Sequence, residues 1–266
     1  MSLAFDRAGS GPPLVLLHGL GHRRQGWDSV LGLLTPHREV ITVDLPGHGA
    51  SAALQADGSK GHNAVAVMAD EIGQLLTSIG LDRPHLAGNS LGGALALVLA
   101  ARGQAASATV LSPAGFPNHG YQVGYARAFF EIALVSARGT RPVAPRLVRS
   151  AAGRALLFGL VVARPGRMSA EQAAGDLAGL ARAADAIHAV FASFEPFTAA
   201  ISEQVPVTIA WGAKDRILSP ANARVARQRL PRARFMPLPG CGHVPMTDDP
   251  ERVAKVLLAG SSGVTA

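Results

Sequence analysis

A short apolar strand, a serine between glycines and an Ala- and Leu-rich helix follow one another directly over residues 85–100. Ser90 is the central residue, and Gly88 and Gly92 lie two positions before and after it. A strand that passes straight into a helix makes a strained turn in which only small residues fit at those two positions. The pattern therefore predicts a strand–turn–helix unit. It places Ser90 at a helix N-terminus, where unpaired N–H groups and the helix dipole favour negative charge.

Similar alternation continues on both sides of this unit. Short apolar runs predict buried strands, and apolar residues at helical spacing predict the helices between them. Strands that alternate with helices indicate a parallel sheet with right-handed crossovers. The fold class predicted is α/β, with a mostly parallel central sheet flanked by helices. Strands are expected at 14–17, 40–43, 85–89, 108–111, 205–211 and 234–238, and helices at 27–34, 63–79, 220–229 and 250–259.

Residues 116–200 interrupt this alternation. The segment has no β-rich run, and alanine, arginine and phenylalanine dominate several helical patterns. We therefore predict an all-helical insertion at 116–200 within one α/β core domain made of residues 1–115 and 201–266.

Composition restricts the classes of function. The chain has 266 residues, 48% hydrophobic and 16% charged, which suits one large domain with a buried core. Its net charge of +7 comes almost entirely from scattered arginines without interleaved aromatic residues, so no nucleic-acid partner is expected. No metal cluster or dinucleotide fingerprint is visible. We expect no metal, no cofactor and a small-molecule substrate; the sequence does not indicate an oligomeric state.

Location and redox state follow from equally simple features. The apolar run at 155–163 has nine residues, whereas a bilayer span needs about 20, so no membrane span is expected. The N-terminus has no signal-peptide pattern, which predicts a cytoplasmic protein. A single cysteine, Cys241, excludes an internal disulfide. This thiol is either a small buried residue or a labelling site beside a late histidine.

A serine hydroxyl becomes a nucleophile when an imidazole takes its proton and an acid orients that imidazole. Among nine histidines, only His243 stands in a glycine-rich loop directly after a late predicted strand. Asp215 also follows a predicted strand, and Asp248 and Asp249 are weaker candidates for the acid. Ser90, Asp215 and His243 all fall at C-terminal strand ends, where open α/β sheets bind ligands. They are the candidate catalytic residues.

A developing oxyanion needs two backbone N–H donors. One donor would be the N–H of Leu91, directly after the candidate nucleophile. The other would come from the loop after the first predicted strand, at Leu20, which follows Gly19. The histidines of the glycine turns, His18 and His48, are interpreted as structural.

Five motifs in order resemble those of the α/β-hydrolase-fold serine hydrolases, and the resemblance covers about two-thirds of the chain. It implies a Ser…Asp…His triad and a helical cap over 116–200. The family's usual first strand has no counterpart here, which argues against an eight-stranded sheet. The motifs are His18-Gly19, Asp44-Leu45-Pro46-Gly47-His48-Gly49-Ala50-Ser51, Gly88-Asn89-Ser90-Leu91-Gly92-Gly93, Trp211-Gly212-Ala213-Lys214-Asp215 and Gly242-His243-Val244-Pro245.

The cap is expected to determine the substrate. Trp27, Phe129 and Phe191 are candidates for the pocket wall, which favours a hydrophobic acyl or aromatic group. Seven arginines and no acidic residue occur between Arg138 and Arg167. Solvated helix faces account for them, although one inward-facing arginine would bind a substrate carboxylate.

Several activities fit these residues. A carboxylic-ester hydrolase, an esterase or lactonase, is the leading hypothesis. Asn89 before the serine resembles carbon–carbon hydrolases of ring-cleavage products, but their aromatic-rich stretch after the histidine is missing at 244–250. A cofactor-free perhydrolase would use the same three residues. A non-catalytic small-ligand receptor on the same fold is the alternative from another class.

Overall fold

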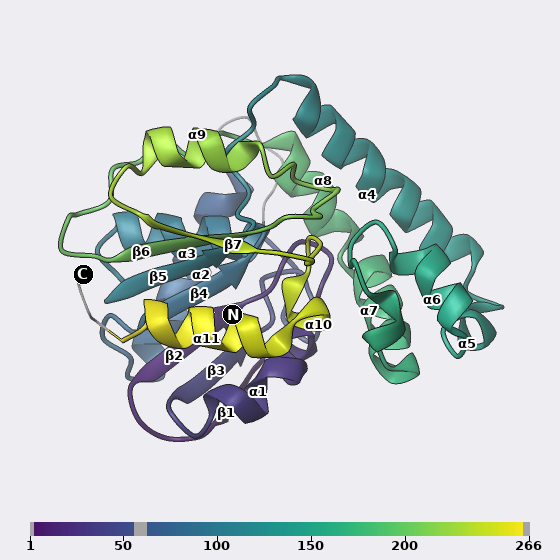
Figure 1. Cartoon of the computed structure of the whole chain (residues 1–266), viewed down its shortest axis with the longest axis horizontal. Coiled ribbons are helices and arrows are strands. Elements are labelled where there is room, and N and C mark those ends of the chain that lie inside the picture. Colours follow the sequence, from purple (N-terminus) through teal and green to yellow (C-terminus); the bar gives the residue numbers. More distant parts are fainter. Residues whose placement is uncertain (1–2, 56–62, 263–266) are drawn as a thin grey trace.

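In a computed structural model, which describes residues 3–55 and 63–262, the strands form one sheet in the order β1-β3-β2-β4-β5-β6-β7 (Figure 1). β1 pairs antiparallel with β3, and every other pairing is parallel. The mostly parallel α/β sheet that the sequence predicts is thereby confirmed. The strands are β1 (Phe5–Ala8), β2 (Pro13–Leu17), β3 (Glu39–Val43), β4 (His85–Asn89), β5 (Ser107–Leu111), β6 (Val207–Gly212) and β7 (Arg234–Leu238).

The edge strand β1 was not predicted from the sequence. Its four residues are all exposed, so it has no apolar pattern for sequence analysis to detect. Arg7 on β1 pairs with Glu39 on β3 across this edge. The described residues form a sheet of seven strands, consistent with the argument against an eight-stranded sheet.

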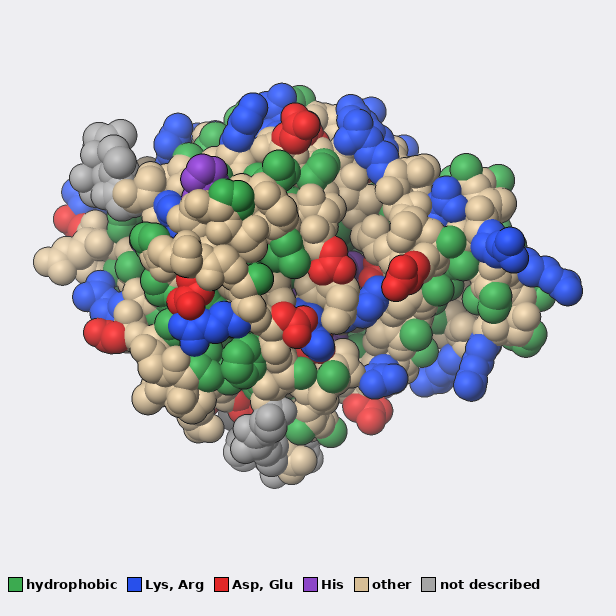
Figure 2. All heavy atoms as spheres, turned by 90° about the horizontal axis from the view of Figure 1, so that it is seen from below, with side chains coloured by type: hydrophobic (Ala, Val, Ile, Leu, Met, Phe, Trp, Pro, Cys, Tyr) green, Lys and Arg blue, Asp and Glu red, His purple; other side chains and the backbone are tan. Residues whose placement is uncertain are grey.

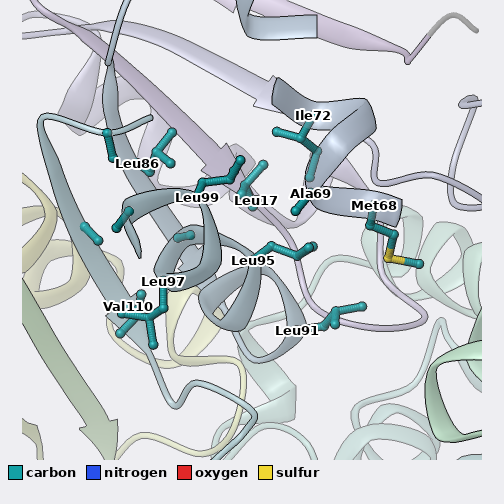
Figure 3. Close-up of a cluster of buried hydrophobic side chains, with 14 of the residues drawn as sticks. Leu17, Met68, Ala69, Ile72, Leu86, Leu91, Leu95, Leu97, Leu99 and Val110 are labelled. Carbon is teal, nitrogen blue, oxygen red and sulfur yellow. The ribbon is translucent and has the colours of Figure 1, made fainter. Parts of the chain in front are cut away.

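Helices cover both faces of the sheet. α2 (Ala64–Ser78), α3 (Leu91–Ala101) and α9 (Asn222–Arg229) contribute to a core on one face, and α1 (Asp28–Leu34) and α11 (Pro250–Gly260) to a core on the other. Alternate residues of a strand face opposite sides of a sheet. On β2, Val15 and Leu17 accordingly enter the first core, while Leu14 and Leu16 enter the second. Figure 3 shows the first core around α3, where Leu91, Leu95 and Leu99 lie among side chains from β2, β4 and α2.

Only helices and connecting loops occur between β5 and β6. Figure 1 shows α4 to α8 on one side of the sheet, with α5 and α6 farthest from it. Phe130, Leu134 and Ile187 pack α4 against α8. No helix in the described part of the chain is long and apolar enough to cross a membrane. The helices are α4 (Tyr121–Gly139), α5 (Ala144–Leu147), α6 (Ala151–Phe158), η2 (Pro165–Arg167), α7 (Ala170–Arg182) and α8 (Ala184–Ala192).

Candidate active site

Ser90 occupies a strained turn between β4 and α3. Its φ of 54° and ψ of −115° lie outside the regions that most residues adopt. The backbone holds this turn, because the Ser90 N–H donates to Leu111 O at 3.0 Å and Ser90 O accepts from Ala94 N and Ala114 N. A Cβ at Gly92 would lie 2.1 Å from Leu17 O, and one at Gly88 would lie 2.2 Å from Gly92 C. These contacts explain why both neighbouring positions are glycine.

His243 and Asp215 form a buried pair. The distance from His243 Nδ1 to Asp215 Oδ2 is 2.8 Å. The other carboxylate oxygen, Oδ1, accepts from Ile217 N at 2.9 Å and Leu218 N at 2.8 Å. A carboxylate at Nδ1 favours the tautomer with its proton there, which leaves the Nε2 lone pair available. The pair therefore has the arrangement of a base and the acid that orients it.

The two weaker acid candidates have other roles. Asp248 is fully buried, and its carboxylate accepts from three backbone N–H groups: Gly242 at 2.7 Å, Ala163 at 3.0 Å and Arg164 at 2.6 Å. Asp248 thereby joins the histidine loop (residues 240–243) to the helical segment (residues 116–200). Asp249 accepts from Arg252 N and caps α11. Neither carboxylate bonds to His243.

Asn89, directly before the serine, connects the loops that carry the site. Its Nδ2 donates to Leu111 O at 3.0 Å and to His243 O at 2.9 Å. His243 N donates to Val161 O at 2.8 Å. The histidine loop is therefore held by β4 on one side and by the helical segment on the other.

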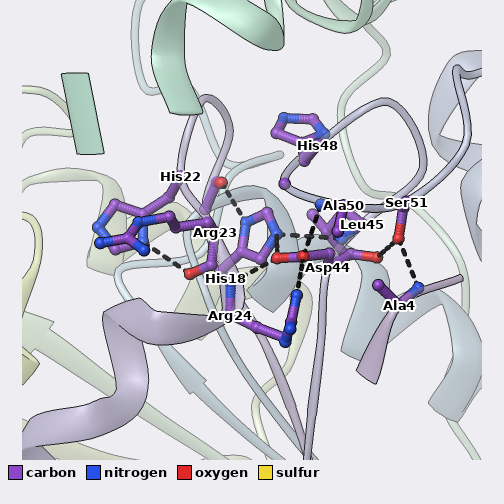
Figure 4. Close-up of polar contacts among 12 residues, drawn as sticks. Ala4, His18, His22, Arg23, Arg24, Asp44, Leu45, His48, Ala50 and Ser51 are labelled. Atoms are coloured by element: carbon purple, nitrogen blue, oxygen red, sulfur yellow. Dashed lines mark hydrogen bonds and ion pairs between the residues drawn. The ribbon is translucent and has the colours of Figure 1, made fainter. Parts of the chain in front are cut away.

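The loop after β2 is held by His18 (Figure 4). His18 Nε2 accepts from Leu45 N at 3.0 Å, so Nδ1 carries the proton and donates to Gly19 O at 2.8 Å. Burial keeps the pKa of His18 well below its ordinary value, which preserves this neutral form. Since the C=O and N–H of a trans peptide point in opposite directions, fixing Gly19 O also fixes the Leu20 N–H.

A second histidine and an aspartate complete this network. His48 Nε2 accepts from Gly21 N at 3.1 Å and Nδ1 donates to Pro46 O at 2.9 Å. Burial lowers the pKa of His48 to about 4. Asp44, also buried, accepts from Arg24 N at 2.7 Å and Ala50 N at 2.9 Å, as Figure 4 shows. The interpretation of His18 and His48 as structural residues agrees with these contacts.

Two cavities meet at Ser90. The smaller has a volume of about 70 Å³ and the larger about 600 Å³. Ser90 and Leu20 line both, Leu91 lines only the smaller, and His243 and Asn89 line only the larger. Most of the remaining lining comes from the helical segment and is apolar.

The expected substrate contacts divide between these cavities. Phe129 lines the larger and Phe191 the smaller. Trp27 lines neither: it is fully buried in the core between the sheet and α1, with Val30 and Leu34. Its proposed place in the pocket wall is therefore wrong, because this start of the helix faces the core. Among the described residues, no arginine lines either cavity, so these cavities do not support the alternative of an inward-facing arginine.

An ionic cluster that was not predicted from the sequence lies at the larger cavity. His22 Nε2 lies 3.4 Å from Asp176 Oδ2, and Arg23 Nε lies 3.2 Å from Asp176 Oδ1. Burial is the largest single influence and alone would lower the pKa of His22, but the Asp176 charge and the hydrogen bonds to Asp176 and the Arg23 backbone together outweigh it, so the pKa is raised. Burial alone would raise the pKa of Asp176, but the charges and hydrogen bonds of His22 and Arg23 lower it. Residues so far apart in sequence gave no local signal of this contact.

Comparison with known proteins identifies the family to which this chain belongs. An uncharacterised protein of Mycobacterium tuberculosis is 28% identical over 273 residues, covering 96% of this chain and 76% of that protein. The crystal structure of a membrane phospholipase A, described as a bacterial virulence factor, is similar with a TM-score of 0.74 and 27% identity. That match covers 98% of this chain and 84% of the other.

A shorter match concerns a different reaction. The 2-hydroxy-6-oxo-6-phenylhexa-2,4-dienoate hydrolase of Comamonas testosteroni is 34% identical over 97 residues, which is 35% of this chain and 32% of that protein. The sequence model described as the alpha/beta hydrolase family matches residues 14–256. The chain belongs to the alpha/beta hydrolase family and is an enzyme of the hydrolase type.

Proposed function

We propose that the chain hydrolyses carboxylic esters with Ser90 as nucleophile, His243 as general base and Asp215 as the acid that orients His243. The observation that carries this proposal is the convergence of a strained serine turn and a buried His–Asp pair on one cavity. The 27% identical phospholipase A, an ester hydrolase by its description, supports the same class of reaction.

In the first half-reaction, Ser90 Oγ attacks the ester carbonyl and His243 Nε2 takes the hydroxyl proton. The N–H groups of Leu20 and Leu91 would stabilise the oxyanion. His243 then donates that proton to the leaving alkoxide, and an acyl-serine remains. In the second half-reaction, water attacks the acyl group and gives a proton to His243. His243 then returns that proton to Ser90 Oγ as the acyl–oxygen bond breaks, so the free acid leaves and both residues are regenerated.

The two cavities indicate which part of the ester lies where. The leaving alkoxide takes its proton from His243, which lines only the larger cavity. The alcohol part is therefore assigned to the larger cavity and the acyl chain to the smaller. The smaller cavity has a volume of about 70 Å³ against about 600 Å³ for the larger, so it suits a short acyl chain. The favoured substrate is a short-chain acyl ester of a bulky, mostly apolar alcohol.

The helical segment supplies most of this specificity and serves as the cap in our proposal, with the limits 116–200 taken from the sequence. Phe129 and Phe191 would contact the alcohol and the acyl group respectively. The sequence predicts a hydrophobic acyl or aromatic group in the substrate. Our proposal assigns the apolar bulk to the alcohol part of the ester and a small group to the acyl part.

Carbon–carbon hydrolysis remains the second candidate, favoured by Asn89 and by the short match to a ring-cleavage hydrolase. Both hydrogen bonds of Asn89 Nδ2, however, connect backbone segments, so scaffolding alone explains this residue. An acidic ring-cleavage product would also gain from an arginine partner, and no described arginine lines either of the two cavities at Ser90. Ester hydrolysis is therefore preferred.

The test is a p-nitrophenyl ester series from acetate to octanoate, with a vinylogous diketone acid assayed in parallel and a serine-directed phosphonate as label. We expect ester turnover, labelling of Ser90, and a loss of about 10⁴-fold or more in Ser90→Ala. Ser136→Ala is the control, since this serine also lines the larger cavity. Turnover of the diketone acid alone would identify a carbon–carbon hydrolase. Absence of turnover and of label would indicate a receptor, and hydrogen peroxide acting as acyl acceptor in preference to water would indicate a perhydrolase.

A further inference from the structure

The excess of positive over negative charge in this molecule falls within one segment. Residues 132–170 contain seven arginines and no lysine, aspartate or glutamate. The net charge of the whole chain is +7, so the remaining residues are balanced. Arg138, Arg141, Arg146 and Arg149 are exposed. None of them forms a salt bridge with another described residue.

Exposed apolar side chains gather in the same segment. Of nine large hydrophobic residues exposed in the described part of the chain, five lie within 132–160: Ile132, Val135, Val143, Leu156 and Leu160. The exposed fractions are 67% for Ile132, 68% for Val135 and 78% for Leu156. Single exposed apolar residues are ordinary, but a group of them marks an interaction surface.

Three members of this apolar group lie at the mouth of the larger cavity. Ile132, Leu156 and Leu160 are exposed and also line the cavity that contains Ser90. Val135 and Arg138 continue along the exposed side of α4, one turn apart. Figure 2 shows hydrophobic and Lys or Arg side chains together at the end of the molecule where Figure 1 places α5 and α6.

We propose that this surface, defined by the five exposed hydrophobic residues and Arg138, Arg141, Arg146 and Arg149, docks on anionic phospholipid bilayers. Apolar side chains enter the boundary between headgroups and acyl chains, and the arginines bind lipid phosphates. The combination favours this occupant over others. A second copy meeting the same surface would bring like charges together, and a nucleic acid would leave the exposed aliphatic side chains unpaired with any apolar surface.

Docking in this orientation would present the mouth of the larger cavity to the lipid. That consequence rests on the proposed ester hydrolysis, since it lets an apolar alcohol ester pass from the bilayer toward Ser90. Binding to the bilayer itself does not depend on catalysis, and the two claims are measured separately.

The experiment uses the full chain and vesicle flotation with phosphatidylcholine alone or mixed with phosphatidylglycerol. The charge variant is Arg138→Gln/Arg141→Gln/Arg149→Gln, and its matched control is Arg224→Gln/Arg229→Gln/Arg234→Gln, which removes the same charge from exposed positions elsewhere. The apolar variant is Val135→Ser/Val143→Ser, at two exposed positions that line neither cavity.

We expect binding to the mixed vesicles that weakens with salt. Each arginine near an anionic surface raises the affinity for the membrane about five-fold. The charge variant, which lacks three arginines, should therefore bind the mixed vesicles about 100-fold more weakly. The apolar variant should also bind more weakly, and the control should change little. Hydrolysis of a soluble acetate ester should persist in all three variants, which shows that they fold.

Three results would overturn the proposal. The first is failure of the wild type to bind mixed vesicles. The second is a loss of affinity in the control Arg224→Gln/Arg229→Gln/Arg234→Gln as large as that in the charge variant. A concentration-dependent increase in mass by light scattering, abolished by the apolar variant without any vesicle binding, would instead assign the surface to a second copy. If no soluble ester is cleaved while vesicles are still bound, the proposed reaction fails and the docking proposal stands.

Discussion

The strand ends and the helical segment at 116–200 differ in how their polar groups are satisfied. At the strand ends, charged or titratable side chains are buried and bonded to backbone or to one another, as for His18, Asp44 and Asp215. In the helical segment, several arginines and aliphatic side chains are exposed, although Asp176 is buried and paired with His22 and Arg23. A reaction centre needs groups held in place by many bonds, whereas recognition of apolar groups needs shape and surface. The first region therefore tolerates substitution poorly, and the second tolerates it well.

The largest expected effect concerns two buried aspartates, Asp215 and Asp248, and tests how the polar groups at the strand ends act. Among the described residues, the Asp215 carboxylate bonds to His243, whereas the Asp248 carboxylate bonds only to backbone N–H groups. Asp215→Asn should lower kcat/KM for an ester by about 10³–10⁴-fold with the fold retained, because His243 loses the carboxylate that orients its tautomer. Asp248→Asn should instead lower the melting temperature, because one amide cannot accept all three backbone N–H groups. Steady-state rates and thermal unfolding of both variants measure this. A large loss of activity in a stable Asp248→Asn protein would show that the assignment is reversed.

The second prediction concerns stability against pH at the strand ends. His48 has a pKa of about 4 in the fold, below its ordinary value near 6.5. Its contribution to stability is therefore present above pH 6.5 and is lost as the pH falls from 6.5 to 4. The loss is about 3 kcal/mol, at about 1.4 kcal/mol per pH unit. Because His22 has a raised pKa, its contribution is present below pH 6.5 and lost above its pKa in the fold.

Urea unfolding of the wild type and of His48→Gln at pH 7.0, 6.0 and 5.0 tests this. The variant is expected to be less stable at pH 7.0, because the bonds to Gly21 and Pro46 are lost or altered, but its stability should fall less steeply with acid. Parallel curves for the two proteins would contradict the prediction.

The third prediction concerns the helical segment and has a smaller magnitude. Phe194 lines only the smaller cavity, and Ala133 lines only the larger. Phe194→Ala should raise the ratio of hexanoyl to acetyl ester turnover by about 10-fold, the range that one or two methylenes supply in an apolar pocket. Ala133→Phe should reduce turnover of naphthyl acetate relative to ethyl acetate. The opposite pattern in the two variants would show that the acyl chain occupies the larger cavity and the alcohol the smaller.

The smallest expected effect is at Cys241, two residues before His243. Its side chain is buried, and burial raises the pKa of its thiol to about 11. A thiol reagent at pH 8 should therefore react very slowly with the native protein and leave ester turnover unchanged. Labelling becomes fast in urea, which is the positive control. Rapid inactivation of the native protein would show that the histidine loop opens more readily than the buried network indicates.

Particular residues show where sequence reasoning succeeded and where it did not. The strands before Ser90 and Asp215, β4 and β6, were predicted because their apolar runs indicate burial on both faces of a sheet. β1 was missed because all four of its residues are exposed. Trp27 was misplaced because helical periodicity does not say whether an aromatic residue at a helix start faces a cavity or the core. Asp176 was not singled out, since its partners His22 and Arg23 lie in a distant loop.

The sequence by itself determined the features that depend on local backbone geometry. Gly88 and Gly92 permit the turn at Ser90, and apolar periodicity sets the order of strands and helices that brings Asp215 and His243 to the same edge. Only the tertiary structure decided which carboxylate meets the imidazole, which cavity holds His243 and which side chains remain exposed around its mouth. Those properties arise from contacts between segments far apart in the chain, and contacts of that kind depend on packing rather than on neighbouring residues.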